Sequence, residues 1–274
     1  MGEQQYEHHI TIRRDKLCPF IHRSLKDLHT SVCNWHRNLE IMLVTRGEGR
    51  MKYDCDDISI GEHDVIVVNS GALHRPYSDS GVSYNYIIID EGFCTENGIS
   101  TSDIVFCRQF KSDAVEKICL EVASRYDRYK KEPAAVNIAR LRLSMLTLLL
   151  ELCENHTESG TERALIRGGA EEYVKKALEY LAEHYTERVA LEDVADVCGI
   201  TKYHLAREFK RYTGQTVFTY INTLRCKKAE VCISQGMTVT EASGESGFES
   251  ISYFSRTYKR LMGHSPSSEK SKFY

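Results

Sequence analysis

One pattern occurs twice in the C-terminal part of the chain. It reads GITKYHLAREFKRYTG over residues 199–214 and GFESISYFSRTYKRLMG over residues 247–263. Basic, aromatic, lysine and closing glycine positions recur at the same offset of 49 residues. The matching pairs are Arg207 and Arg256, Phe209 and Tyr258, Lys210 and Lys259, and Gly214 and Gly263. A fixed offset shared by such different residue types indicates a duplicated supersecondary unit.

Each copy has the pattern of two helices joined by a sharp turn. In the first copy an apolar stripe at helical spacing starts at Leu191 and ends before Gly199, a residue that tolerates positive φ. Thr201 is a good N-cap for the next helix, whose basic residues lie away from its apolar face. The second copy repeats this layout around Gly247, with a turn one residue longer. A single copy could be an ordinary amphipathic hairpin with a solvated basic face, but two in register predict helix-turn-helix units.

The charge of this region fits a nucleic-acid partner. Residues 201–274 contain twelve Lys or Arg and six acidic residues, a net charge of +6, whereas the whole chain carries −3. Positive charge is therefore concentrated where the predicted reading helices lie, as phosphate binding requires. Because the chain is not strongly basic overall, we expect modest non-specific DNA binding.

A longer motif connects the two copies. It comprises Leu-x-x-Val-Ala-x-x-x-Gly-Ile at 191–200, His-Leu-x-Arg-x-Phe-Lys at 204–210, Gly214, Arg225-x-x-x-Ala229, Gly247-Phe248, Ser252-Tyr253-Phe254-Ser255-Arg256, Tyr258-Lys259, Gly263 and Pro266. With this motif, residues from about 171 to 272 resemble the DNA-binding domain of AraC-type transcription regulators. The resemblance implies a linker helix at about 217–234 and two units that read successive major grooves. Ser243, Gly244 and Lys270 depart from the family pattern, and Gly244 weakens the helix that contains it.

The resemblance also implies which side chains contact DNA. The base-facing positions would be Tyr203, Ala206 and Arg207 in the first reading helix, and Ile251, Ser252, Ser255 and Arg256 in the second. Lys210 and Lys259 are expected at phosphates, and Arg211 belongs to the same basic surface.

Residues 8 to about 108 have the pattern of short strands separated by glycine turns, at 10–12, 40–45, 49–53, 64–68 and 84–89. Many short strands without a long helix predict a barrel or sandwich. Two segments resemble cupin motifs: His36-x-x-x-Glu40 followed by Gly47, and 61–74, which ends at His74. Asn34 and Asn69 stand where the motifs usually have His and Pro. Such barrels are the effector domains of many AraC-type regulators.

The cupin-like residues allow two interpretations. His36, Glu40 and His74 are residue types that ligate iron or manganese, but Asn34 leaves only three ligands. We favour a pocket for a small polar effector, for which a sugar is one candidate. In this pocket His36, Glu40 and His74 would form hydrogen bonds with the effector, and Trp35, Tyr53 or Tyr86 would form its apolar walls. We therefore expect no catalytic residue, no cofactor and no resident metal, and the binding of a metal by the barrel stays an open alternative.

Two helical stretches follow, at 113–131 and 134–154, with an apolar stripe wider than a lone surface helix needs. They either pack on their own barrel or contribute a dimer seam. Residues 156–169 have the composition of a flexible linker. The predicted division is an effector-binding and dimerisation domain at 1–155, a linker at 156–169 and a DNA-binding domain at 170–274.

The predicted fold is α+β multidomain, with a cupin-like β-barrel and helical hairpin before an all-α double helix-turn-helix domain. Neither a signal stretch nor a membrane-spanning run is present in the sequence, and the ten cysteines form no C-x-x-C pair, so we expect reduced thiols in the cytoplasm. We predict a transcription regulator, not an enzyme, with double-stranded DNA, a small effector and a second copy as partners, and RNA polymerase as a candidate. The alternatives are a cupin metalloenzyme fused to a DNA-binding module and a regulator whose barrel serves only to dimerise.

Overall fold

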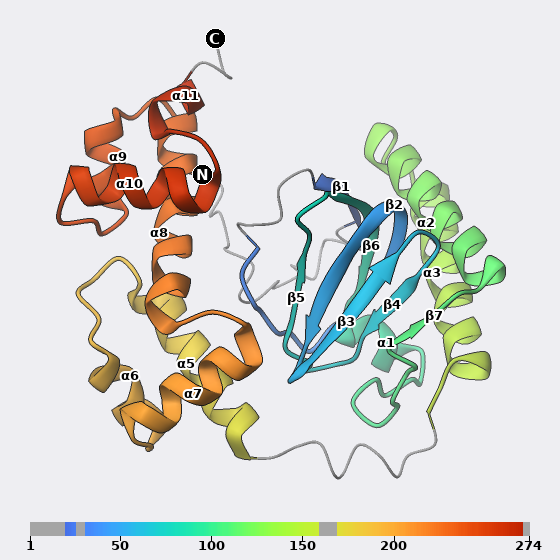
Figure 1. The fold of residues 1–274 in the computed structure, drawn as a ribbon. Helices are drawn as coiled ribbons and strands as arrows, with labels where there is room; N and C mark the ends of the chain where they lie inside the picture. The colour runs from blue at the N-terminus through green and yellow to red at the C-terminus, as the bar shows by residue number, and fades with distance from the viewer. Residues whose placement is uncertain (1–19, 26–30, 159–168, 271–274) are drawn as a thin grey trace.

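The computed structural model describes residues 20–25, 31–158 and 169–270. In them a curled antiparallel sheet with a helical hairpin stands beside a second, helical domain (Figure 1). The predicted fold class is thereby confirmed. The strand expected at 10–12 lies outside the described residues, as do residues 159–168 of the expected linker. None of the helices in the described ranges is long and apolar enough to cross a membrane.

The sheet owes its curl to one long strand. Its strands are β1 (Phe20–Leu25), β2 (Leu39–Tyr53), β3 (Asp56–Gly61), β4 (Val65–Val68), β5 (His74–Tyr77), β6 (Val82–Ile89) and β7 (Gln109–Phe110). β2 pairs with β6 and β4 along its first half, and with β3 and β5 along its second half. A register shift between Val44 and Arg46 adds local twist. The sheet therefore bends over itself into a half-barrel.

Side chains of β2 alternate between two cores, as the two-residue period of a strand requires. Ile41 and Leu43 pack under the helical hairpin, whereas Met42 and Val44 pack in the barrel interior. The hairpin consists of α2 (Asp113–Lys131) and α3 (Ala135–Asn155), and short α1 (Glu91–Glu96) precedes it. Glu40 alternates in step with Met42 and Val44, so a carboxylate lies on the inner, otherwise apolar face of β2.

The C-terminal domain repeats its helix-turn-helix unit. Its helices are α5 (Gly169–His184), α6 (Leu191–Cys198), α7 (Lys202–Thr213), α8 (Val217–Ser234), α9 (Val239–Glu245), α10 (Ile251–Met262) and α11 (Pro266–Lys270). The second helices of the two units, α7 and α10, begin 49 residues apart and end 49 residues apart, each at a left-handed glycine. The departing residues Ser243 and Gly244 are part of α9, which a capping box between Thr238 and Glu241 supports.

Helix α8 belongs to both units. Tyr220 and Leu224 in its first half are buried in the core of the first unit, and Ala229 and Ile233 in its second half are buried in the core of the second. Figure 1 shows α8 running from α5–α7 to α9–α11. The linker helix predicted at 217–234 therefore lies where the sequence indicates, and both of its ends are fixed.

Gly247 gives a test of the turn in the second unit. Its φ of +84° is left-handed, and a β-carbon there would lie 2.3 Å from the carbonyl oxygen of Thr186. We expect Gly247→Ala to lower the free energy of unfolding by more than about 1–2 kcal/mol, the ordinary cost of that backbone conformation, because the clash adds to it. Urea denaturation of the full chain measures the change.

Gly244→Ala is the matched control. Gly244 lies inside α9 with open space around it, so alanine there should stabilise the helix by up to about 1 kcal/mol. Equal effects of the two substitutions would contradict the close approach at Gly247.

Candidate functional site

The first predicted reading helix, α7, presents its predicted residues to solvent. Thr201 caps it by accepting a hydrogen bond from the amide of His204, and Leu205 and Phe209 anchor its inner face in the core. Tyr203 is 79% exposed. The remaining predicted contacts on this helix are also exposed: Ala206, Arg207, Lys210 and Arg211.

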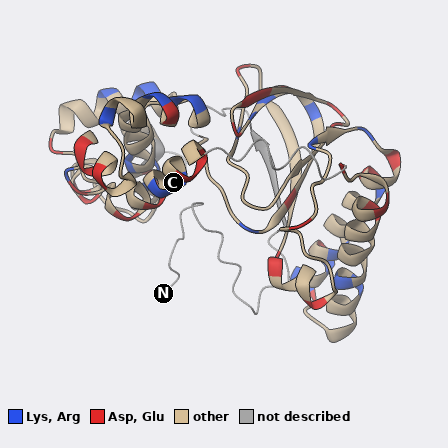
Figure 2. Cartoon of the chain, turned by 90° about the horizontal axis from the view of Figure 1, so that it is seen from below, with Lys and Arg blue, Asp and Glu red and all other residues tan. Residues whose placement is uncertain are grey.

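The second reading helix, α10, has the same organisation. Phe254 and Tyr258 are fully buried, and Ser250 caps the helix by accepting from the amide of Tyr253. The predicted contacts Ile251, Ser252, Arg256 and Lys259 are exposed, and Ser255 is half-buried. In Figure 2 basic positions gather along one edge of the helical domain. All these side chains are accessible to DNA, and their individual roles stay predictions.

The sequence did not indicate the role of Glu208. Its buried carboxylate accepts from Arg207 Nε at 2.9 Å and from Arg211 Nη1 at 3.1 Å, and Arg207 also contacts His204 Nδ1 at 3.1 Å. Burial by itself would raise the pKa of Glu208, but the hydrogen bond from Arg207 and the charge of Arg211 outweigh it and lower the pKa. Glu208 therefore stays ionised and orients two of the predicted DNA-contacting guanidinium groups.

In the domain formed by β1–β7 and α1–α3, which we call the sensor domain after its predicted effector site, the structure brings His36, Glu40 and His74 together. His36 Nε2 lies 3.0 Å from Glu40 Oε2, and His74 Nε2 lies 3.5 Å from the same oxygen. The two imidazole rings meet edge to face with centroids 5.1 Å apart. All three residues are buried, with exposed fractions of 4%, 9% and 3%. We call these three residues the sensor cluster.

Backbone carbonyls orient both rings of the sensor cluster. His36 Nδ1 donates to the carbonyl of Asn38 at 3.0 Å, and His74 Nδ1 donates to the carbonyl of Ala72 at 3.1 Å, because a carbonyl oxygen only accepts. The Nε2 atom of each ring therefore faces Glu40. Burial by itself would raise the pKa of Glu40, but the charge of His74 and the hydrogen bond with His36 hold it well below its usual value. Burial would lower the pKa of His74, and the Glu40 carboxylate reverses this and raises it.

Two of the three aromatic residues predicted for the effector pocket lie in the barrel interior, and the third does not. Tyr53 is buried, and its hydroxyl accepts from the amide and the side chain of Asn69 at 2.9 and 3.1 Å. Tyr86 lies in the barrel lining beside Tyr84. Trp35 lies at the boundary with the helical domain. Tyr53 and Tyr86 both belong to the interior core that the inner face of β2 also lines, whereas Trp35 packs against the core of the first helix-turn-helix unit, so the three side chains do not form one wall.

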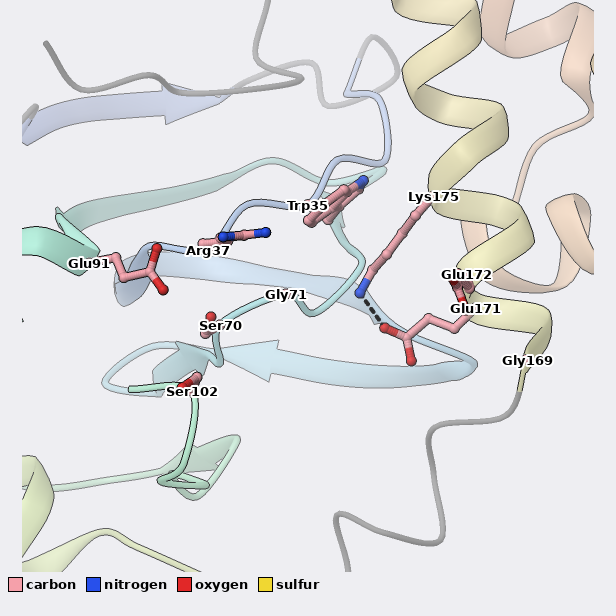
Figure 3. Close-up of a pocket in the computed structure, with 10 residues that line it drawn as sticks. All are labelled: Trp35, Arg37, Ser70, Gly71, Glu91, Ser102, Gly169, Glu171, Glu172 and Lys175. Carbon is pink, nitrogen blue, oxygen red and sulfur yellow. Dashed lines mark hydrogen bonds and ion pairs between the residues drawn. The ribbon is translucent and has the colours of Figure 1, made fainter. Parts of the chain in front are cut away.

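Trp35 borders a cavity of about 500 Å³ between the sensor domain and α5. Figure 3 shows Lys175 reaching from α5 toward Trp35, with its ammonium 4.9 Å from the ring centroid while it pairs with Glu171. Arg37 and Glu91 line the sensor side of the cavity. The sequence did not predict this cavity because its walls come from segments far apart in the chain.

The sensor cluster lies next to the contacts between the domains. Cys33 precedes Asn34, which exchanges two backbone hydrogen bonds with His74, at 3.1 and 2.9 Å. The carbonyl of Cys33 accepts from Tyr220 Oη of α8 at 3.1 Å. Arg75 follows His74, and its guanidinium lies against the glycine that closes α7. A displacement of His74 would therefore reach both α7 and α8.

Comparisons with known proteins identify both domains of the structure. Residues 21–143 match the model of an AraC-like ligand binding domain, and residues 194–271 match that of a helix-turn-helix domain. The chain belongs to the AraC family of helix-turn-helix transcription regulators. It is thus a DNA-binding regulator with an N-terminal ligand-binding domain of the AraC type, as the resemblance in the sequence implies.

The relatives are transcription regulators too. The chain is 24% identical over 250 residues to the uncharacterised HTH-type transcriptional regulator YdeC of Bacillus subtilis, covering 86% of this chain and 85% of that protein. It is 29% identical over 130 residues to the transcriptional activator RhaS of Enterobacter sp., covering 47% of this chain and 45% of RhaS. Among solved structures, an apo form of ToxT from Vibrio cholerae aligns with a TM-score of 0.52 at 15% identity, covering 95% of this chain and 99% of ToxT, which shows a shared fold.

Arg207 gives a test of the first reading helix. If the Arg207 guanidinium donates hydrogen bonds to O6 and N7 of a guanine, Arg207→Ala should weaken operator binding by about 1–3 kcal/mol and relax specificity at one base pair. Lys259→Ala should instead weaken binding to all DNA sequences by the same factor, because a phosphate contact carries no sequence information. Affinities for operator and random duplexes at fixed salt measure both effects. An unchanged operator-to-random ratio in Arg207→Ala would remove Arg207 from the base-reading positions.

Proposed function

We propose that this regulator acts in the cytoplasm as a homodimer and that a small polar effector in the sensor domain controls its binding to double-stranded DNA. The observation that carries the proposal is the position of the sensor cluster. A polar group of three buried side chains lies on the inner side of an apolar half-barrel, and each histidine is a chain neighbour of a residue at the domain boundary. Binding of the effector and transmission of its signal to the DNA-binding domain would therefore use the same short segments of the chain.

The chemistry of the cluster favours an effector with hydroxyl groups. Glu40 accepts hydrogen bonds, and imidazole nitrogens both donate and accept, which suits alternating donors and acceptors such as those of a sugar. One relative has a name that points the same way: the xylose operon regulatory protein of Escherichia coli is 28% identical over 94 residues, 34% of this chain. A polar ligand of this class would replace contacts that the three residues now make with each other.

A metalloenzyme fused to a DNA reader is the second candidate. The match to the bifunctional transcriptional activator and DNA repair enzyme AdaA of Bacillus subtilis, 31% identical over 99 residues, covers 35% of this chain and 46% of AdaA. A match over this share of the chain does not indicate an enzymatic reaction in the sensor domain. The regulatory function without catalysis is therefore preferred.

An apolar stripe on the hairpin supports the homodimer. Val136, Leu143 and Leu150 of α3 follow each other at intervals of seven residues and are 55%, 65% and 45% exposed, and Leu120 of α2 is 47% exposed. The inner residues of α3 already fill the core beneath the helix. A second, outward row of large aliphatic side chains at heptad spacing fits a helix of another copy.

The effector response gives the test of the proposed function. In a thermal-shift screen of sugars and related polyols on the full chain, we expect one compound to raise the melting temperature and to change the affinity for a selected operator. His74→Ala should remove both effects, because an unpaired buried group costs about 1–3 kcal/mol. Tyr220→Phe should keep the thermal shift and lose the change in DNA affinity, since it removes the hydroxyl that donates to the Cys33 carbonyl across the domain boundary.

Tyr77→Phe is the matched control for Tyr220→Phe. The Tyr77 hydroxyl donates to Asp57 on the sensor surface, so its loss leaves the domain boundary intact, and the response should persist. A His74→Ala protein that responds normally would place the effector elsewhere. A chain that binds operator but responds to no compound would support a barrel used only for dimerisation.

The dimer seam makes a separate prediction. Leu143→Glu places a charge in the middle of the stripe and should shift the full chain toward monomer in sedimentation equilibrium. Val197→Glu, at a similarly exposed aliphatic residue on α6, should leave the oligomeric state unchanged. A Leu143→Glu protein that stays dimeric would place the seam on another surface.

A further inference from the structure

The sensor cluster has the geometry of a cation site. Its three donor atoms, one from each residue, all lie within 4.8 Å of one another and all three residues are buried. We propose that His36, Glu40 and His74 bind one divalent transition-metal cation through His36 Nε2, Glu40 Oε2 and His74 Nε2. The site is independent of the reading helices, so its occupancy is measurable without DNA or an organic effector.

Ring orientation is the first argument for a cation. Both Nδ1 atoms donate to backbone carbonyls, so a neutral ring would carry its lone pair on Nε2. Two such lone pairs would face the lone pairs of one carboxylate oxygen in a buried place. Either protons, on the rings or on the carboxyl group, or a metal ion must therefore lie between these atoms. A ligating histidine whose other nitrogen donates to a backbone carbonyl is the usual arrangement around a metal.

The distances favour the metal over two protons. Charge-assisted hydrogen bonds between imidazolium and carboxylate are typically about 2.7–2.9 Å long. The two contacts to Glu40 Oε2 are longer, at 3.0 and 3.5 Å. Ligand atoms about 2.0–2.1 Å from a tetrahedral zinc ion lie about 3.3–3.4 Å from each other. The two contacts to Glu40 Oε2 bracket that value, and because all three donor atoms lie within 4.8 Å of one another, a cation fits once the side chains close around it.

The donor set selects the class of cation. Two imidazole nitrogens and one carboxylate oxygen suit zinc, cobalt, nickel or iron in the divalent state, whereas magnesium and calcium prefer oxygen ligands throughout. Three protein donors leave at least one coordination position for a further oxygen or nitrogen donor. That position would accept water or a donor atom of the polar effector.

A bound cation would also fix the domain boundary. By holding His36 and His74 it would immobilise the segments that carry Trp35, Cys33 and Arg75, which contact α5, α8 and the end of α7. This regulatory consequence, unlike the binding itself, rests on the proposed function. We therefore expect chelation to change the affinity of the full chain for its operator.

Cobalt binding tests the site directly. The full chain, freed of metal by a chelator, is titrated with Co²⁺ and followed by visible absorption. We expect one equivalent to bind, with the ligand-field bands of a nitrogen and oxygen site, and Zn²⁺ to displace it. Glu40→Gln and His74→Gln should each weaken binding by at least about tenfold, the lower end of what even outer-sphere substitutions cost. His63→Gln is the matched control, because His63 pairs with Glu116 on the surface away from the cluster.

X-ray absorption of the zinc-loaded wild-type chain keeps the test independent of variants that fail to fold. We expect a shell of two imidazoles and one carboxylate. A sulfur shell would overturn the proposal, because it would assign the ion to cysteines. That outcome is disfavoured for the most buried thiols, such as Cys33 and Cys119, whose pKa burial raises to about 12. Absence of stoichiometric binding, or binding unchanged in both cluster variants, would equally overturn it.

Operator affinity separates the two proposals. If the metal binds as described and operator affinity is the same with and without it, the cation site stands and its regulatory role fails. If no metal binds while a polar compound still alters operator affinity, the cation site fails and the proposed function stands.

Discussion

The burial of α8 by both helix-turn-helix units is the constraint on which the DNA-reading geometry depends. Arg225, in the middle of the helix, strengthens it: its guanidinium donates to the carbonyls of Tyr185 and Glu187 at 2.6 and 2.7 Å and lies over the ring of Phe248. One side chain thus connects the segment after α5 with the turn of the second unit. The two reading helices cannot change their separation without uncovering apolar core, which costs roughly 25 cal/mol for each Å² exposed.

This rigidity limits where a signal from the sensor domain can act. In the described residues the sensor contributes Val32, Cys33 and Leu73 to the core of the first unit and nothing to the core of the second. A change in the sensor therefore meets the reader at the first half of α8 and the end of α7. Since α8 transmits motion as a rigid element, a shift there would move both reading helices together relative to the sensor and relative to a second copy.

The sequence predicted the elements whose signals are local. The 49-residue repeat, the capping residues and the helical periodicity all lie within a few turns of the structure they specify, and α2, α7, α8 and α10 follow them closely. The two cupin-like segments likewise predicted one site for His36, Glu40 and His74, and the structure places them together. The sequence could not separate Trp35 from Tyr53 and Tyr86, because which side of the barrel an aromatic residue faces depends on strand register and on the packing of the second domain.

Glu208 was missed for a related reason, since a single acidic residue in a basic helix has no sequence signal until its burial is known. Its environment differs instructively from that of Glu40. Each buried carboxylate has two cationic or potentially cationic partners, but those of Glu208 are arginines, which stay charged at every physiological pH. The partners of Glu40 are histidines, which are cationic only when protonated and otherwise present lone pairs to the carboxylate.

The arrangement of the guanidinium groups on α7 is therefore permanent, whereas the charge balance of the sensor cluster depends on what is bound there. A carboxylate in an apolar barrel is costly unless it is paired, so the state with a matched ligand or cation is the one that packs best. Because the segments flanking both histidines contact the reader, the free energy of that match is available to position α7 and α8. The reading surface forms once during folding, and under the proposed function the state of the sensor cluster sets its position.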